Sequence, residues 1–248
     1  MDIKTYAKAK LRLIPGLVPL VRLCRLALLP GYRSEWRLAR SRPDNLFQPF
    51  STTAPDRYPR VFSFLRDRMP EGAPLRVLSY GCSTGEEVFT LRRYFPDAEI
   101  VGVDINPSNI AVCHKKQKRS PDSRLRFAVA ASPQAEPEAY YDVILCMSVL
   151  RHGELEVKKP ENCSHLICFA DFERIVSELG RCLKPGGFLA IANSHFRFAE
   201  TAVAEDFEVA YRVEPRANRT TSQIYDKRNI RLDGVTYSDV VFCKRMGT

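Results

Sequence analysis

The sequence lacks an uninterrupted apolar run long enough to cross a bilayer, although 45% of its 248 residues are hydrophobic. The longest candidate, residues 11–29, is interrupted by prolines and arginines, namely Arg12, Pro15, Pro19, Arg22 and Arg25. A spanning helix needs about 20 predominantly apolar residues, so this segment is not expected to be one. A cleavable signal peptide pattern is also missing, and we therefore expect a cytoplasmic protein.

Sets of metal ligands are scarce as well. The eight cysteines are scattered through predicted strands and helices, and the closest approach to a metal pattern is Cys163, His165 and Cys168. This trio lacks the second ligand pair of a structural zinc site, so no metal is expected there. Small apolar side chains in a loop are the simpler interpretation. The scattered cysteines favour a reducing compartment over a disulfide framework.

Acidic residues are rare in the first 40 positions. Nine basic residues there stand against Asp2 and Glu35, a net +7 (nine minus two) of the chain's +9. The other residues are nearly neutral in sum and contain no recognisable nucleic-acid module, so DNA or RNA is not expected as a partner. The basic run at 114–119 is expected to complement the dipole at the C-terminal end of a helix.

The basic N-terminal segment has two interpretations. Its apolar side chains could form a lid over a ligand site, or residues 1–40 could make peripheral contact with an anionic membrane surface. We favour the lid, because proline breaks limit the length of an interfacial helix. Both interpretations hold together if the substrate is lipid-like. The sequence does not indicate an oligomeric state.

From Leu75 onward, short apolar runs alternate with helical periods, as is typical of βα units and a mostly parallel sheet. Strands are predicted at 75–80, 99–104, 125–130, 141–147, 188–193, 207–213 and 239–244. The clearest helix covers 171–183, and the turn residues Lys184 to Gly187 are expected to end it. We predict a Rossmann-like α/β domain over 71–248, with a seven-stranded, mostly parallel sheet and helices on both faces. Residues 1–70 are predicted to form a helical, basic extension, with breaks at Pro15, Pro19, Pro30 and Pro43.

The first predicted strand leads into a glycine-containing loop and then a helix. Gly81 and Gly85 allow close backbone approach, and the loop amides are expected to face a ligand. Ser83 and Thr84 are expected to cap the helix. The loop lacks the three-glycine spacing that packs a dinucleotide's pyrophosphate against a helix N-terminus.

Acidic side chains accompany this loop. Glu86 and Glu87 would oppose phosphate, and Asp104 ends the second strand, where a carboxylate can accept hydrogen bonds from ribose hydroxyls. Helix capping is the alternative role for Asp104, although Asn106 before Pro107 is better placed for it. The acids suit the ammonium and sulfonium of S-adenosylmethionine better than a nicotinamide dinucleotide. A nicotinamide-dependent oxidoreductase stays open as the lesser alternative.

Four segments between Leu75 and His195 resemble the ordered motifs of class I S-adenosylmethionine-dependent methyltransferases: GCSTGEE, VGVDIN, YDVILCMSVL and LGRCLKPGGFLAIANSH. CSTGEE, with Ser79 in place of the usual acidic residue, is most similar to chemotaxis-receptor glutamate methyltransferases. The resemblance implies S-adenosyl-L-methionine as cofactor. It implies a methionyl site at Gly81, Cys82, Ser83 and Glu86, ribose and adenine contacts at Asp104 and Ile105, Ala131 near the adenine, and a pocket floor of Cys146 and Met147.

The resemblance also concerns the acceptor side. Arg57 and Phe62 reproduce a family spacing ahead of the nucleotide domain, which implies that Arg57 binds a carboxylate. The family's Arg-Asn pair is replaced by Met147 and Ser148, and its active-site Tyr by His152. His152 is a candidate general base for a hydroxyl or amine, with a helix-capping histidine as the alternative. We expect in-line methyl transfer to a small molecule or protein side chain. The alternative is a non-catalytic S-adenosylmethionine-binding protein that acts through its basic N-terminus.

Overall fold

A seven-stranded sheet lies at the centre of the computed structural model, which describes residues 17–213 and 223–247. The strand order is β3-β2-β1-β4-β5-β9-β6, and β9 runs antiparallel to both β5 and β6. The remaining neighbours are parallel. The strands are β1 (Arg76–Tyr80), β2 (Glu99–Asp104), β3 (Leu125–Val129), β4 (Tyr141–Met147), β5 (Leu183–Ala192), β6 (Phe207–Arg212) and β9 (Asp239–Lys244). The predicted Rossmann-like sheet is confirmed.

Helices cover both faces of the sheet, which is why its central strands are apolar nearly throughout. One face carries α4 (Pro59–Arg68), α5 (Glu86–Tyr94) and α6 (Pro107–Arg119), whose side chains share a core with alternate residues of β1 and β4. The opposite face carries α8 (Phe169–Cys182), whose stripe includes Phe172, Ile175 and Leu179. The basic run at 114–119 lies in the last turns of α6, as expected.

The junction between α8 and β5 differs from the prediction. The helix ends at Cys182, and the strand begins immediately, because Leu183 already pairs with Tyr141 of β4. The ladder is irregular before it resumes at Phe188 and Val143. Lys184 to Gly187 therefore lie within β5, rather than forming a turn ahead of it. A two-stranded sheet of β7 (Ile224–Tyr225) and β8 (Arg231–Leu232), also not predicted, follows later in the chain.

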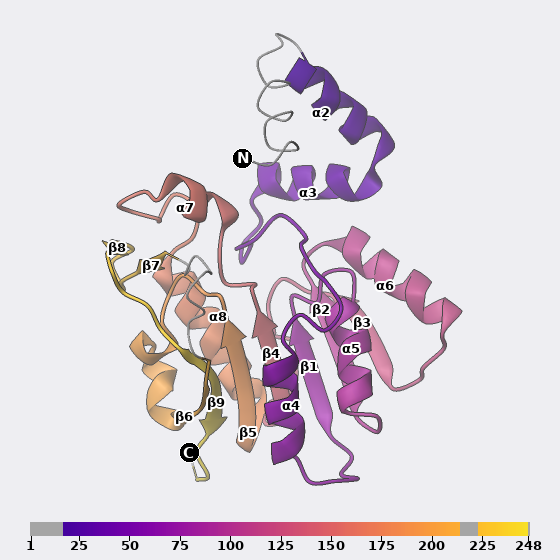
Figure 1. Cartoon of the computed structure of the whole chain (residues 1–248), viewed down its shortest axis with the longest axis vertical. Coiled ribbons are helices and arrows are strands. Elements are labelled where there is room, and N and C mark those ends of the chain that lie inside the picture. The colour runs from indigo at the N-terminus through magenta and orange to yellow at the C-terminus, as the bar shows by residue number, and fades with distance from the viewer. Residues whose placement is uncertain (1–16, 214–222, 248) are drawn as a thin grey trace.

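The N-terminal helices α2 (Leu17–Leu28) and α3 (Pro30–Ser41) lie beyond the carboxyl ends of the parallel strands (Figure 1). Pro19 lies in the first turn of α2, where its missing N–H breaks no helical bond, so the predicted break at Pro19 was wrong. Arg33 Nε donates to the Leu26 carbonyl at 2.8 Å and ties the helices together. Pro15 lies outside the described residues.

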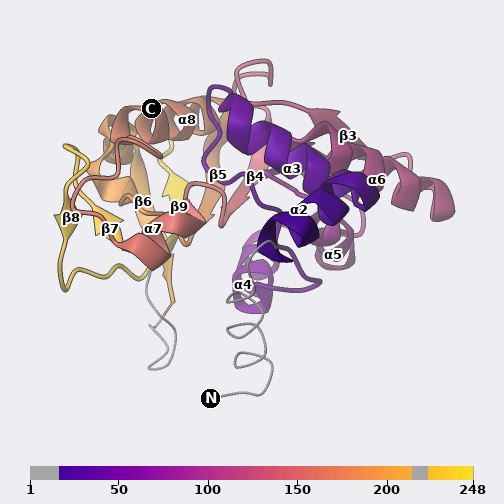
Figure 2. The same cartoon turned by 90° about the horizontal axis from the view of Figure 1, so that it is seen from above.

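Viewed from above, α3 lies over the half of the sheet that carries α6, and α7 (Gly153–Lys158) lies on the side of β7 and β8 (Figure 2). Two short 3-10 helices, η1 (Phe198–Glu200) and η2 (Ala202–Asp206), lead from β5 to β6. Within the described ranges, the helices are all too short or too polar to cross a membrane.

Candidate active site

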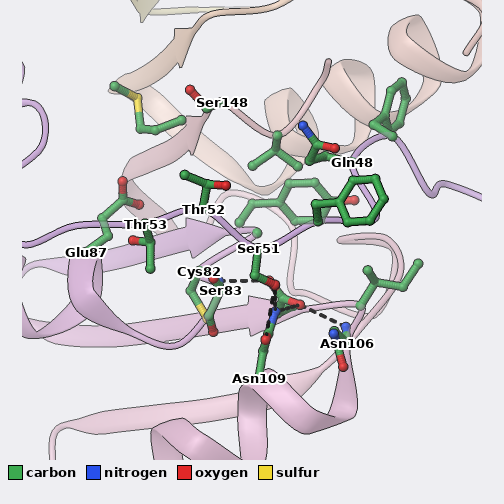
Figure 3. Close-up of a pocket in the computed structure, with 18 of the residues that line it drawn as sticks. Gln48, Ser51, Thr52, Thr53, Cys82, Ser83, Glu87, Asn106, Asn109 and Ser148 are labelled. Atoms are coloured by element: carbon green, nitrogen blue, oxygen red, sulfur yellow. Dashed lines mark hydrogen bonds between the residues drawn. The ribbon is translucent and has the colours of Figure 1, made fainter. Parts of the chain in front are cut away.

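A cleft opens at the carboxyl ends of β1, β2 and β4, the edge at which open α/β sheets bind ligands. It contains about 930 Å³ of space, including open solvent at its mouth. The segment between α3 and α4, residues 42–58, forms one wall, and we call it the N-terminal strap. Figure 3 shows Gln48, Ser51, Thr52 and Thr53 of this strap facing the strand ends.

The strap is attached at several points. The side chain of Phe47 is only 3% exposed and belongs to the core. Near its ends, Arg42 Nη1 donates to the His165 carbonyl at 3.2 Å, and the Asp56 N–H donates to Thr90 Oγ1 at 3.1 Å. The N-terminal region thus contributes a fixed wall to the cleft.

The turn after β1 depends on glycine. Gly81 has φ 75°, and a Cβ there would lie 2.4 Å from Cγ2 of Val149, so no side chain fits. The N–H groups of Gly81 and Cys82 both donate to the Val103 carbonyl, at 2.8 and 2.9 Å. The Ser83 N–H donates to a carboxylate oxygen of Asp104 at 2.8 Å. The expectation that these amides face a ligand was therefore wrong.

The helix after the turn begins without the expected side-chain cap. Gly85, with φ 90°, is the N-cap residue of α5 and leaves neither Ser83 nor Thr84 in the capping position. Thr84 Oγ1 instead donates to Glu86 Oε2 at 2.6 Å. The Ser83 hydroxyl oxygen is buried and has no hydrogen-bond partner.

Asp104 lies at the end of β2 and is 8% exposed. Its Oδ1 accepts from the Asn106 N–H at 2.8 Å and from Asn109 Nδ2 at 3.0 Å. Burial raises the pKa of Asp104, and these hydrogen bonds oppose the rise. Among the described residues, Oδ2 accepts only from the Ser83 N–H, so this carboxylate, which lines the cleft, retains acceptor capacity. Asn106 caps α6, as expected, by accepting from the Ser108 N–H at 2.9 Å.

The two adjacent acids of α5 have different surroundings. Glu87 lines the cleft and accepts from Ser79 Oγ at 2.7 Å. Burial raises the pKa of Glu87 to about 7, against the opposing effects of the Ser79 hydrogen bond and the charge of Arg57. Glu86 does not line the cleft, because it forms an ion pair with Lys116 on α6. Of the two acids, only Glu87 lines the cleft.

Three unpartnered polar atoms belong to residues of this cleft. Among the described side chains, seven buried nitrogen or oxygen atoms have no hydrogen-bond partner, and three of them belong to cleft residues. These are Gln48 Oε1, Ser83 Oγ and Asn106 Nδ2 (Figure 3). Buried polar groups are nearly always paired in native proteins, so these three atoms have hydrogen-bonding capacity available to a ligand.

The other predicted cofactor residues divide into two groups. Cys82, Ile105 and Met147 line the cleft. Cys146 is fully buried beneath it, and Ala131 is displaced by its neighbour Ala130 as a lining residue. The sequence analysis missed Gln48, Ser51, Tyr58, Asn106, Asn109 and Ser148 as cleft residues, and it named Glu87 only together with Glu86 as an acid suited to a cationic ligand. The sequence held one signal that pointed to Glu87. Ser79 occupies the position on β1 where related enzymes have an acidic residue, so a carboxylate has to come from another element.

The candidate base, His152, lies outside the cleft lining. It is the N-cap residue of α7, and its Nδ1 accepts from the Glu154 N–H at 3.2 Å. Burial lowers the pKa of His152. The geometry thus corresponds to the helix-capping alternative, since Nδ1 is already engaged and His152 is not among the residues that line the cleft.

Arg57 lines the cleft and has an exposed side chain whose Nη1 donates to the Thr52 carbonyl at 3.0 Å. In the trio Cys163, His165 and Cys168, Cys168 Sγ donates to Asp171 Oδ2 at 2.9 Å. Across residues 17–213 and 223–247, no three His, Cys, Asp or Glu side chains are grouped as metal ligands would be.

Known proteins with similar sequences are methyltransferases. Demethylmenaquinone methyltransferase of Thermus thermophilus is 30% identical over 49% of this chain and 48% of its own length. Trans-aconitate 2-methyltransferase of Methylobacterium radiotolerans is 29% identical over 55% of this chain and 44% of its own length. The chain thus spans about half the length of the curated relatives it matches.

A solved structure of phosphoethanolamine N-methyltransferase 2 from Haemonchus contortus with S-adenosyl-L-methionine covers 67% of this chain and 34% of its own, at 18% identity and a TM-score of 0.42. Similarity to the chemotaxis-receptor enzymes in particular is not among these findings. The family model described as "Methyltransferase domain" matches residues 72–229, more than half of the chain. The chain therefore belongs to the methyltransferase domain family, whose class I members use S-adenosyl-L-methionine as cofactor.

Proposed function

We propose that the protein transfers a methyl group from S-adenosyl-L-methionine to a small molecule or a protein side chain. The observation that carries this proposal is the cleft itself, which combines a buried carboxylate with three unpartnered polar atoms at the family's cofactor edge. These groups fit the cofactor, which presents an ammonium, a ribose and an adenine. A dinucleotide would bring a pyrophosphate to Glu87 instead.

The adenosyl end of the cofactor is assigned to the β2 side of the cleft. The free acceptor capacity of Asp104 Oδ2 suits a ribose hydroxyl donor. Asn106 Nδ2 supplies an unused donor and Gln48 Oε1 an unused acceptor, which suits the edge of an adenine ring. Ile105, beside them in the lining, supplies apolar contact.

The methionyl end is assigned to Glu87 and Arg57. Glu87 presents its carboxylate to the ammonium, and Arg57 is close enough to lower the pKa of Glu87 and can bind the cofactor carboxylate. When bound, the cofactor supplies an electrophilic methyl group on a sulfonium. The protein's contribution is orientation and exclusion of water, for which the N-terminal strap forms the outer wall.

Titration calorimetry with S-adenosylmethionine, S-adenosylhomocysteine and NAD tests the cofactor assignment. We expect the first two to bind and NAD not to bind. Asp104→Asn is expected to weaken binding at least tenfold, whereas Asp122→Asn, which changes a carboxylate paired with Arg92 away from the cleft, is expected to have no effect. Selective NAD binding would overturn the proposal. Production of S-adenosylhomocysteine separates an enzyme from a non-catalytic binder.

A peripheral membrane contact is proposed as a second property, for α2 alone. Its exposed apolar side chains include Leu23 at 64% and Leu28 at 76%, Arg25 beside them is exposed, and no acidic residue occurs in the helix. This composition suits an anionic lipid surface. We expect sedimentation with phosphatidylglycerol vesicles but not with phosphatidylcholine vesicles, and loss of sedimentation in Leu23→Glu/Leu28→Glu. Equal sedimentation of that variant would exclude the contact.

A further inference from the structure

Three polar side chains close a triangle of hydrogen bonds at the edge of the cleft. Tyr58 Oη lies 2.6 Å from Ser148 Oγ, and Asn193 Nδ2 donates to both hydroxyl oxygens, at 3.1 and 2.7 Å. Tyr58 and Ser148 line the cleft, and Figure 3 shows Ser148 at the end of its strand beside the cavity. All three side chains are only partly buried, so the triangle is accessible from the cleft.

The sheet brings two corners of the triangle together. Met147 pairs with Ala192 in the β4–β5 ladder, and the Ser148 N–H donates to the Ala192 carbonyl at 2.8 Å. Ser148 and Asn193, each the residue after its strand, have φ of 61° and 54°. Left-handed backbone is disfavoured for most residues with a Cβ, by about 1–2 kcal/mol, while asparagine adopts it more readily, so the strain falls mainly on Ser148. Such strain persists mainly where the side chains are needed, and these two point at each other.

The third corner comes from the strap. Tyr58 is its last residue and precedes α4, so the triangle joins the outer wall of the cleft to the ends of the two strands. The guanidinium of Arg57 lies 5.3 Å from the centre of the Tyr58 ring and adds positive charge to this end of the cleft.

Counting hydrogens shows what the triangle offers to a ligand. Each of the three edges needs one hydrogen, so the triangle needs three. The two hydroxyls supply two hydrogens and the Asn193 amide supplies two more, which makes four. One hydroxyl hydrogen is therefore left over. The opposite amide orientation would leave three edges to be filled by two hydrogens, which excludes it. Among the described residues, the two hydroxyls have no further hydrogen-bond partner.

We propose that Tyr58, Ser148 and Asn193 form the subsite that holds an oxygen atom of the methyl acceptor, with the spare O–H as donor. This inference rests on the proposed function and adds the acceptor's chemistry to it. A carboxylate, carbonyl or hydroxyl oxygen has the lone pair that the donor requires, and the charge of Arg57 favours an anionic one. An ammonium group has only hydrogens to donate, so it cannot use the spare O–H, and the positive charge of Arg57 disfavours it.

Two small probes of opposite chemistry test the subsite: acetate, which accepts hydrogen bonds, and methylammonium, which only donates them. Each is titrated, by ligand-detected NMR, into protein saturated with S-adenosylhomocysteine. We expect acetate to bind and methylammonium not to bind. The variant Tyr58→Phe/Ser148→Ala removes both hydroxyls and is expected to weaken acetate binding about tenfold, the loss of one good hydrogen bond.

The control is Tyr94→Phe, which removes a tyrosine hydroxyl bonded to Asp56 of the strap but away from the cleft. It is expected to leave acetate binding unchanged, and both variants are expected to bind S-adenosylhomocysteine within twofold of the parent protein. No acetate binding to the parent, equal acetate binding to the double variant, or preference for methylammonium would overturn the subsite. Failure of S-adenosylhomocysteine to bind the parent would instead refute the proposed function.

Discussion

Replacing Glu87 by glutamine is expected to raise the stability of the protein while weakening its binding of the cofactor. The pKa of this buried carboxyl is about 7 in the folded protein and 4.5 as its ordinary value. Because the folded value is raised, the stability associated with the neutral form is present below pH 4.5 and is lost as pH rises through 7. By pH 8 the loss reaches about 3 kcal/mol. Glu87→Gln removes this loss, and the cofactor-free variant is expected to melt several degrees higher at pH 8.

The same variant is expected to bind S-adenosylmethionine more weakly. A hydrogen bond between charged groups contributes about 1.5–3 kcal/mol, so the Kd should rise roughly 10- to 150-fold. In the parent protein, affinity should increase about fivefold from pH 6 to pH 7 as Glu87 ionises, while an α-amino group stays largely protonated. The variant should lose this dependence. Calorimetry over this pH range and thermal melts without cofactor measure both effects.

Glu86→Gln is the matched control, since it changes the adjacent acid, which forms an ion pair with Lys116 outside the cleft. It should keep the parent's Kd and pH dependence. The reasoning is refuted if Glu87→Gln melts lower than the parent at pH 8 and binds the cofactor with unchanged affinity.

Two further predictions concern the turn and the candidate base. Gly81→Ala places a methyl group against Val149 at a left-handed backbone position. Urea titrations should show a free energy of unfolding lower by about 1–3 kcal/mol, with partial recovery in Gly81→Ala/Val149→Ala. An unchanged free energy of unfolding would contradict the contact. His152→Ala should cost about 1 kcal/mol of stability through the lost cap of α7 and leave turnover largely intact. A hundredfold loss of turnover at unchanged stability would restore His152 as the base.

The sequence was sufficient to predict the strands whose apolar residues form a continuous run in the sequence. The bounds of β2 and β4 were predicted to the residue, because each apolar run is enclosed by polar residues. The β5 boundary was not, since pairing of Leu183 with Tyr141 is a contact between distant segments. The predicted cap of α5 was wrong for a different reason. Gly85, in a left-handed conformation, is the N-cap residue, in place of the good capping residues Ser83 and Thr84.

The site was predictable in its location and less so in its side chains. Asp104 follows directly from the strand pattern. The choice between Glu86 and Glu87 depends on the helical phase set by the turn, which shifts the inward direction by about 100° per residue. Tyr58 required knowledge that the strap crosses the strand ends, and no periodicity encodes that contact.

The position of the strap in the chain has a consequence for the two halves of the site. It lies upstream of residues 72–229, the part that matches the family, yet it supplies one wall of the cleft and a corner of the hydrogen-bonded triangle. The inherited domain thus contains the carboxylates assigned to the cofactor, while a separate stretch of chain touches the position assigned to the acceptor. A change of sequence in the strap would therefore alter the acceptor position through Tyr58, and part of the cofactor site through Gln48 and Arg57, while Glu87 and Asp104 stay in place.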